Sequence, residues 1–138
     1  MKLPTQVTGN IGLYYACYKL SRRGWNVMPT ARNARGIDII AYNSNGTHFI
    51  GVQVKTLSKR DPVPLGDNLD NIMGDYWIII NNALKEPNAF VMKPDEVKRL
   101  AHRDEKDGKV SFWLNTASYD TPEYKEAWRR IGDGHGMA

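Results

Sequence analysis

The sequence predicts a single α/β or α+β domain with a mixed central β-sheet flanked by helices. Its 138 residues, 41% hydrophobic and 25% charged, are typical of one globular domain. Segments with helical periodicity alternate with short apolar runs, which is the order expected of such a fold. One of these runs, residues 76–80, is almost continuously apolar and predicts a strand that is buried on both faces.

The first element is predicted to be a helix over residues 8–23. Its apolar side chains at Ile11, Tyr14, Tyr15 and Tyr18 follow the spacing of one helical face. Gly24 can end the helix, because glycine adopts the left-handed conformation of a helix C-terminus. A short strand, "WNVMP", follows and ends at a proline.

The next two strands form an antiparallel hairpin. Residues 37–42 and 48–55 are rich in β-formers, and "NSNG" lies between them. Asparagine and glycine tolerate the positive φ angles of tight turns, so the short connection favours direct pairing of the two strands.

The second half of the chain continues the alternation. The expected elements are, in chain order, an irregular stretch over 57–74 with a short helical turn near 69–73, strands at 76–80 and 89–92, a helix at 94–101, an exposed charged stretch at 102–109, a strand at 110–114 and a helix at 120–131. Thr121 and Pro122 suit the start of the last helix. The glycine-rich stretch 132–138 predicts a disordered tail, so the single domain is expected to span residues 1–131.

Composition narrows the possible partners and surroundings. The formal net charge of +4 is compatible with a polyanionic partner but does not require one. No apolar run approaches the roughly 20 residues that cross a bilayer, so no membrane association is expected. The first residues lack the apolar core of a secretion signal, and the single cysteine, Cys17, excludes an internal disulfide; a cytoplasmic location is expected.

Three polar side chains at one end of the hairpin form a candidate functional site. Gln53 and Lys55 lie two residues apart and therefore on one face of their strand, and Asp38 lies at the same end of the hairpin. A carboxylate and an amide oxygen are hard ligands that suit Mg²⁺, and a lysine beside them can stabilise charge on a phosphate. The alternative from spacing alone is an ordinary ion pair between Asp38 and Lys55 at the strand ends.

The segment "GIDIIAYNSNGTHFIGVQVKT", residues 36–56, resembles the core of the PD-(D/E)xK nuclease superfamily in its QxK form. "GNIGLYYACYKLSRRGWNVMPT" looks like the family's first helix and strand, and "DYWIIINN", "AFVMKPDEVKRL" and "YKEAWRRI" look like its later elements. The resemblance covers most of residues 8–131 and implies a restriction endonuclease-like fold.

Carried over residue by residue, the resemblance implies a metal-dependent endonuclease that acts on DNA. Asp38 and Gln53 would be catalytic residues that hold Mg²⁺ or Mn²⁺ together with the backbone carbonyl of Val54, and Lys55 would be the catalytic lysine. A neutral amide at Gln53 binds the metal more weakly than a carboxylate does. Many relatives place a glutamate on the first helix, where this sequence has Leu13.

The same resemblance implies which residues contact nucleic acid and which oligomeric state the protein has. The residues expected to contact nucleic acid are Arg32, Arg35, Thr56, Lys59 and Arg60. For the charged ones, the alternative is a solvated loop surface. A homodimer is expected, because a duplex has two strands and the chain has one site. The alternative function is a catalytically inactive module of the same fold that binds nucleic acid or a protein partner.

Overall fold

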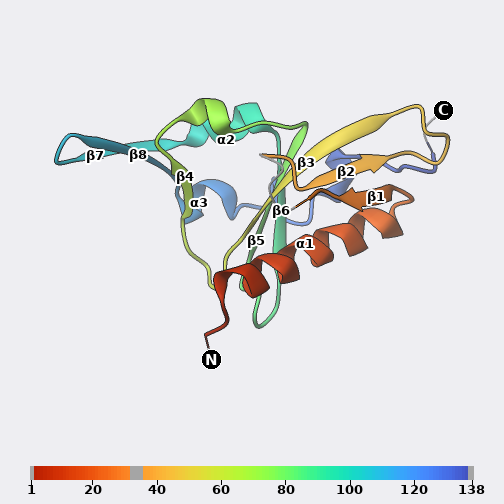
Figure 1. The fold of residues 1–138 in the computed structure, drawn as a ribbon, viewed down its shortest axis with the longest axis horizontal. Helices are drawn as coiled ribbons and strands as arrows, with labels where there is room; N and C mark the ends of the chain where they lie inside the picture. Colours follow the sequence, from red (N-terminus) through yellow and green to blue (C-terminus); the bar gives the residue numbers. More distant parts are fainter. Residues whose placement is uncertain (1, 32–35, 137–138) are drawn as a thin grey trace.

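The computed structural model describes residues 2–31 and 36–136. These residues form two sheets and a few helices (Figure 1). The elements are, in chain order, α1 (Thr5–Arg22), β1 (Asn26–Pro29), β2 (Ile39–Tyr42), β3 (Phe49–Thr56), β4 (Val63–Gly66), the 3-10 turn η1 (Leu69–Asn71), β5 (Tyr76–Asn81), β6 (Asn88–Met92), α2 (Pro94–Leu100), β7 (His102–Lys106), β8 (Lys109–Leu114), α3 (Thr116–Tyr119) and the 3-10 turn η2 (Trp128–Arg130).

The larger sheet confirms the predicted mixed topology. Its strand order is β1-β2-β3-β5-β6, and every pair is antiparallel except β3 and β5, which run parallel. The predicted hairpin is present, with Ile39 opposite Val52. The apolar run at 76–80 forms β5 in the interior of the sheet, and residues 77–80 are buried, as the sequence predicted.

The two faces of this sheet contact different apolar clusters. Val52 and Ile78 lie on the face that packs against α1, together with Ala16 and Leu20 of that helix. The other face carries Trp77 and Ile79, which pack with residues of β4, α2 and α3. The three-stranded sheet, ordered β4-β8-β7, lies beside this second cluster, and its β7–β8 hairpin projects away from the body in Figure 1.

The buried face of α1 differs from the one that the sequence predicted. Tyr14 and Tyr18 are 61% and 55% exposed, whereas the fully buried positions of the helix carry the smaller side chains of Gly12, Ala16 and Leu20. The reason is that α1 approaches β3 too closely for an aromatic ring at Gly12. A Cβ atom there would lie 2.7 Å from Thr56 Cβ.

Strands β4 and β7 were not predicted, because they depend on pairing with β8. The exposed charged stretch forms one arm of the β7–β8 hairpin, and all five residues of β7 are exposed. Its turn consists of Asp107 and Gly108, with φ angles of 54° and 79°. Aspartate followed by glycine is a signal for such a turn, so the sequence did carry a local sign of this hairpin.

The predicted closing helix at 120–131 is wrong. Lys125 forms a bridge with Phe90 at the edge of β6, the Val91 amide donates to the Tyr124 carbonyl at 2.9 Å, and the Glu126 amide donates to the Ala89 carbonyl at 2.7 Å. Because an edge strand offers unpaired backbone groups, the segment pairs with β6 instead of coiling. Tyr124, Trp128 and Ile131 are nonetheless buried, as their apolar stripe suggested.

The stretch expected to form a disordered tail makes several contacts over its described part, residues 132–136. The Trp25 indole donates to the Gly132 carbonyl at 2.9 Å, and the Gly134 amide donates to the Arg23 carbonyl at 2.9 Å. Asp133 also pairs with Arg23 at 3.2 Å. These contacts hold the segment against the turn that joins α1 to β1.

We predict that Gly12→Ala destabilises the protein by about 1–3 kcal/mol, because the added methyl overpacks the contact between α1 and Thr56. Gly9→Ala is the matched control. It lies on the same helix, where a Cβ would meet nothing within 4 Å, and should stabilise by about 0.5–1 kcal/mol through helix propensity. Urea unfolding of both variants checks this, and equal effects would refute the close packing.

Candidate active site

The end of the β2–β3 hairpin brings Asp38 beside β3. The Asp38 amide donates to the Val52 carbonyl at 2.8 Å, and the Val54 amide donates to Asp38 Oδ2 at 2.7 Å. Asp38 directly precedes Ile39, the first residue of β2. Its backbone amide and its side chain therefore extend the pairing of this segment with β3. These two hydrogen bonds fix the position of the carboxylate next to the strand that carries Gln53 and Lys55.

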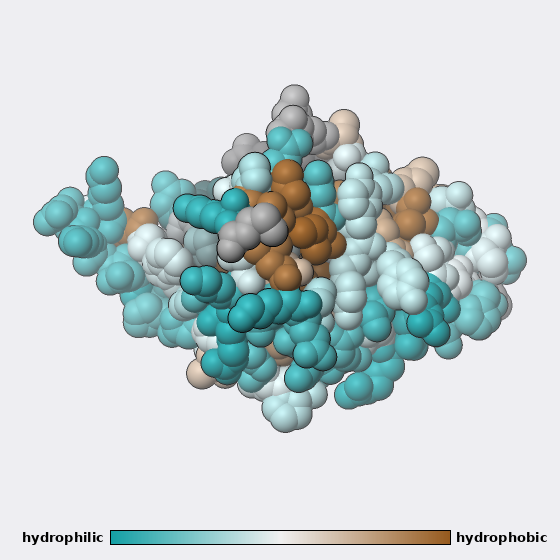
Figure 2. Space-filling model, turned by 90° about the horizontal axis from the view of Figure 1, so that it is seen from below, coloured by the Kyte–Doolittle hydropathy of each residue, from teal (hydrophilic) through white to brown (hydrophobic). Residues whose placement is uncertain are grey.

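A cleft of about 530 Å³ lies between the N-terminal half of α1 and this end of the hairpin. It is lined by Gln6, Gly9, Asn10, Leu13, Tyr14, Pro29, Thr30, Ala31, Asp38, Val54, Lys55 and Thr56. The structure thus places Asp38, Val54, Lys55 and Thr56, all predicted site residues, around one open space. The surface seen from below in Figure 2 is mostly hydrophilic, with a brown apolar patch near its middle.

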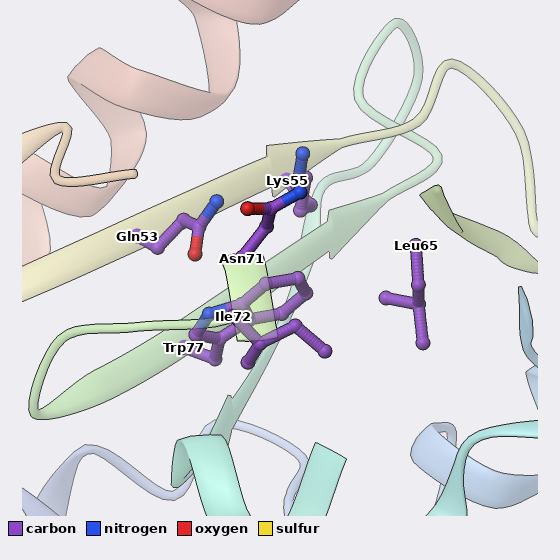
Figure 3. Close-up of a pocket in the computed structure, with 6 residues that line it drawn as sticks. All are labelled: Gln53, Lys55, Leu65, Asn71, Ile72 and Trp77. Carbon is purple, nitrogen blue, oxygen red and sulfur yellow. The ribbon is translucent and has the colours of Figure 1, made fainter. Parts of the chain in front are cut away.

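Gln53 faces a different space. The residue is 8% exposed, and it lines a smaller cavity of about 60 Å³ with Lys55, Leu65, Asn71, Ile72 and Trp77 (Figure 3). Lys55 is shared by the cavity and the cleft, and its ammonium lies 5.8 Å from the centre of the Trp77 ring. Gln53 and Asp38 are therefore brought to adjoining spaces that meet at Lys55.

The oxygen atoms at this end of β3 are suitable for a hard divalent cation. Gln53 Oε1 is buried and has no hydrogen-bond partner, so it can still act as a ligand. The N–H and C=O of one residue point to the same side of a strand, so the Val54 carbonyl lies on the side where its amide meets Asp38. Carboxylate, amide and carbonyl oxygens are the ligand types that Mg²⁺ takes. No group of three His, Cys, Asp or Glu side chains suited to a metal occurs within residues 2–31 and 36–136.

The residues predicted to contact nucleic acid are placed differently from one another. Thr56 lines the cleft and touches the helix at Gly12. Lys59 is exposed in the loop after β3, whereas Arg60 pairs with Asp120 at 2.7 Å. Arg32 and Arg35 lie outside the described residues.

The structure places two side chains near the site that the sequence did not assign to it. Leu13 lies in the wall of the cleft that holds Asp38. Trp77, which belongs to the apolar run at residues 76–80, lies next to Gln53 and beneath Lys55. The parallel register of β3 and β5, which makes this contact, has no local signal in the sequence.

Comparisons with known proteins support the fold. No protein-family model matches the sequence, and no curated protein matches it. The structure is similar to that of a bacterial homing endonuclease, I-Ssp6803I, at 20% identity, a TM-score of 0.62, and coverage of 94% of this chain and 93% of that one. A Holliday junction resolvase, Hjc from Archaeoglobus fulgidus, gives 17% identity, a TM-score of 0.48, and coverage of 78% and 90%. The chain therefore has the restriction endonuclease-like fold that its resemblance to PD-(D/E)xK nucleases implied.

Proposed function

We propose that the protein is an endonuclease that hydrolyses phosphodiester bonds in DNA with Mg²⁺ or Mn²⁺ as cofactor. The observation that carries the proposal is that Asp38 and Lys55 line one open cleft, with the carboxylate held in place by the Val54 amide. The similarity in fold to a homing endonuclease favours the same reaction class.

Each residue of the site has a chemical task in this proposal. Asp38, Gln53 Oε1 and the Val54 carbonyl would hold the metal ion, which supplies a Lewis acid and an activated water when bound. Lys55 places its ammonium where the cleft and the smaller cavity meet, and it would stabilise the negative charge that develops on the phosphate. Thr56 and the exposed Lys59 would position the DNA backbone through phosphate contacts.

The proposed partners follow from the same site. A homodimer would provide two sites for the two strands of a duplex. We place the protein in the cytoplasm, in agreement with its single cysteine. Among the helices that the structure describes, none is both long and apolar enough to span a membrane.

A catalytically inactive module that binds nucleic acid or a protein partner is the second candidate. The observation that favours it is that Leu13, an apolar residue, lines the cleft. Of the described residues that line the cleft and the cavity, only Asp38 carries a carboxylate. One carboxylate binds a divalent cation weakly, so such a site could keep the fold and lose the reaction.

We predict that the wild-type protein nicks plasmid DNA with Mg²⁺ or Mn²⁺, and that Asp38→Ala and Lys55→Ala each lower the rate by at least about 100-fold. Asp38→Ala removes the charged ligand of the metal ion, and Lys55→Ala removes the cation that stabilises charge on the phosphate. Asp104→Ala and Lys109→Ala are matched controls on the exposed β7–β8 hairpin and should keep full activity. Binding of DNA by the wild type without nicking, and with no effect of metal, would establish the inactive module instead.

We predict that Gln53→Glu lowers the Mg²⁺ concentration for half-maximal nicking by about 10-fold, since a charged oxygen ligand binds the cation more strongly. Asn45→Asp is the control, because it adds the same charge at an exposed position in the turn between β2 and β3, at the end of the hairpin opposite Asp38. A metal titration of nicking checks this, with thermal unfolding measured separately. An unchanged titration midpoint would show that residue 53 does not hold the metal.

A further inference from the structure

Trp77 touches both polar residues of β3 that the proposed reaction uses. It is the partner of Gln53 in the parallel pairing of β3 and β5, so the two side chains lie on the same face of the sheet. Its ring also lies under the Lys55 ammonium, at 5.8 Å from the ring centre. With 1% of its surface exposed, the ring forms a fixed floor beneath the two side chains (Figure 3).

The indole N–H of Trp77 differs from those of the other tryptophans. Trp25 donates to the Gly132 carbonyl, Trp113 to Ser111 and Trp128 to Glu126, at 2.9, 3.2 and 2.9 Å. Trp77 Nε1 is buried and has no acceptor, and Gln53 Oε1, also buried, has no donor. The two residues line the same cavity of about 60 Å³, which has room for a water molecule.

The groups around this cavity determine how such a water is oriented. The indole N–H and the Lys55 ammonium are donors only. A water that accepts from both has used its two lone pairs, so it can only donate. Asn71 also lines the cavity, but Gln53 Oε1 is the lining acceptor that is buried with no partner, so it is the one that such a water satisfies. The amide is then held with its oxygen on the Trp77 side, as in Figure 3, and one lone pair of that oxygen stays available.

We propose that Trp77 is a positioning residue of this centre, which orients the Gln53 amide through one water in the cavity and holds the Lys55 ammonium over its ring. The water bridge depends only on the packing of β3 and β5. The effect of the bridge on metal binding rests on the proposed function. The bridge and its effect on metal binding therefore need separate tests.

The first test follows the indole N–H signals by ¹H–¹⁵N NMR without metal or DNA. Trp→Phe substitutions at the four positions assign the signals; if Trp77→Phe does not fold, the other three assign Trp77 by elimination. Gln53→Met, which keeps the length of the side chain but has no acceptor, should shift the Trp77 signal and speed its exchange with solvent at least about 3-fold, as expected for a lost hydrogen bond. The matched control Gln6→Met should change none of the four signals. A Trp77 signal that is unchanged in Gln53→Met overturns the bridge.

The second test is a double-mutant cycle on metal activation of nicking. Trp77→Phe keeps a ring under Lys55 and should raise the Mg²⁺ concentration for half-maximal activity about 3- to 10-fold in the Gln53 protein. In Gln53→Glu the same change should have little effect, because the two oxygens of a carboxylate are equivalent and need no orientation. Equal effects in both backgrounds overturn the positioning role. If the wild type does not nick DNA, the proposed function is contradicted. The NMR test still decides whether the water bridge exists, because it uses neither metal nor DNA.

Discussion

The position of β3 between an antiparallel and a parallel neighbour is the constraint on which the rest of the structure depends. β2 fixes its register from one side and β5 from the other. Because side chains alternate along a strand, this register directs Val52 and Val54 toward α1 and directs Gln53 and Lys55 to the opposite face. A shift of β3 by one residue would turn the lysine toward the helix and place a valine on the face that carries the site, so core packing and site geometry are specified together.

The close contact of α1 with β3 then shapes the space around the site. Gly12 lets the helix lie against Thr56, and the helix wall that results carries Leu13 into the cleft beside Asp38. A glycine inside a helix lowers its intrinsic stability, and that cost is offset by burial of Ala16 and Leu20 in the cluster under the sheet. The dimensions of the cleft are thus a consequence of packing at one small residue.

The surroundings of Gln53 give a physical reason for an amide rather than a carboxylate at this position. The side chain is almost completely buried, with Leu65, Ile72 and Trp77 around it and Lys55 as the nearby cation. An ionised carboxylate in such a place loses several kcal/mol of solvation that one lysine only partly restores. A neutral amide avoids this cost and keeps an oxygen for binding, at the expense of charge attraction to a metal ion.

The sequence by itself determined the features that depend on local pattern. The hairpin of residues 37–55, the placement of Asp38 and Lys55 at one end of it, and the strand at 76–80 all follow from alternation, turn residues and an apolar run. Tertiary structure alone decided the rest, because pairing and close packing act between residues far apart in the chain. The closing segment forms turns and a bridge on the open edge of β6 instead of a helix, and Tyr14 and Tyr18 turned outward because the helix lies too close to Thr56. The contact of Trp77 with Gln53 and Lys55 likewise exists only because β5 runs parallel to β3 in this register.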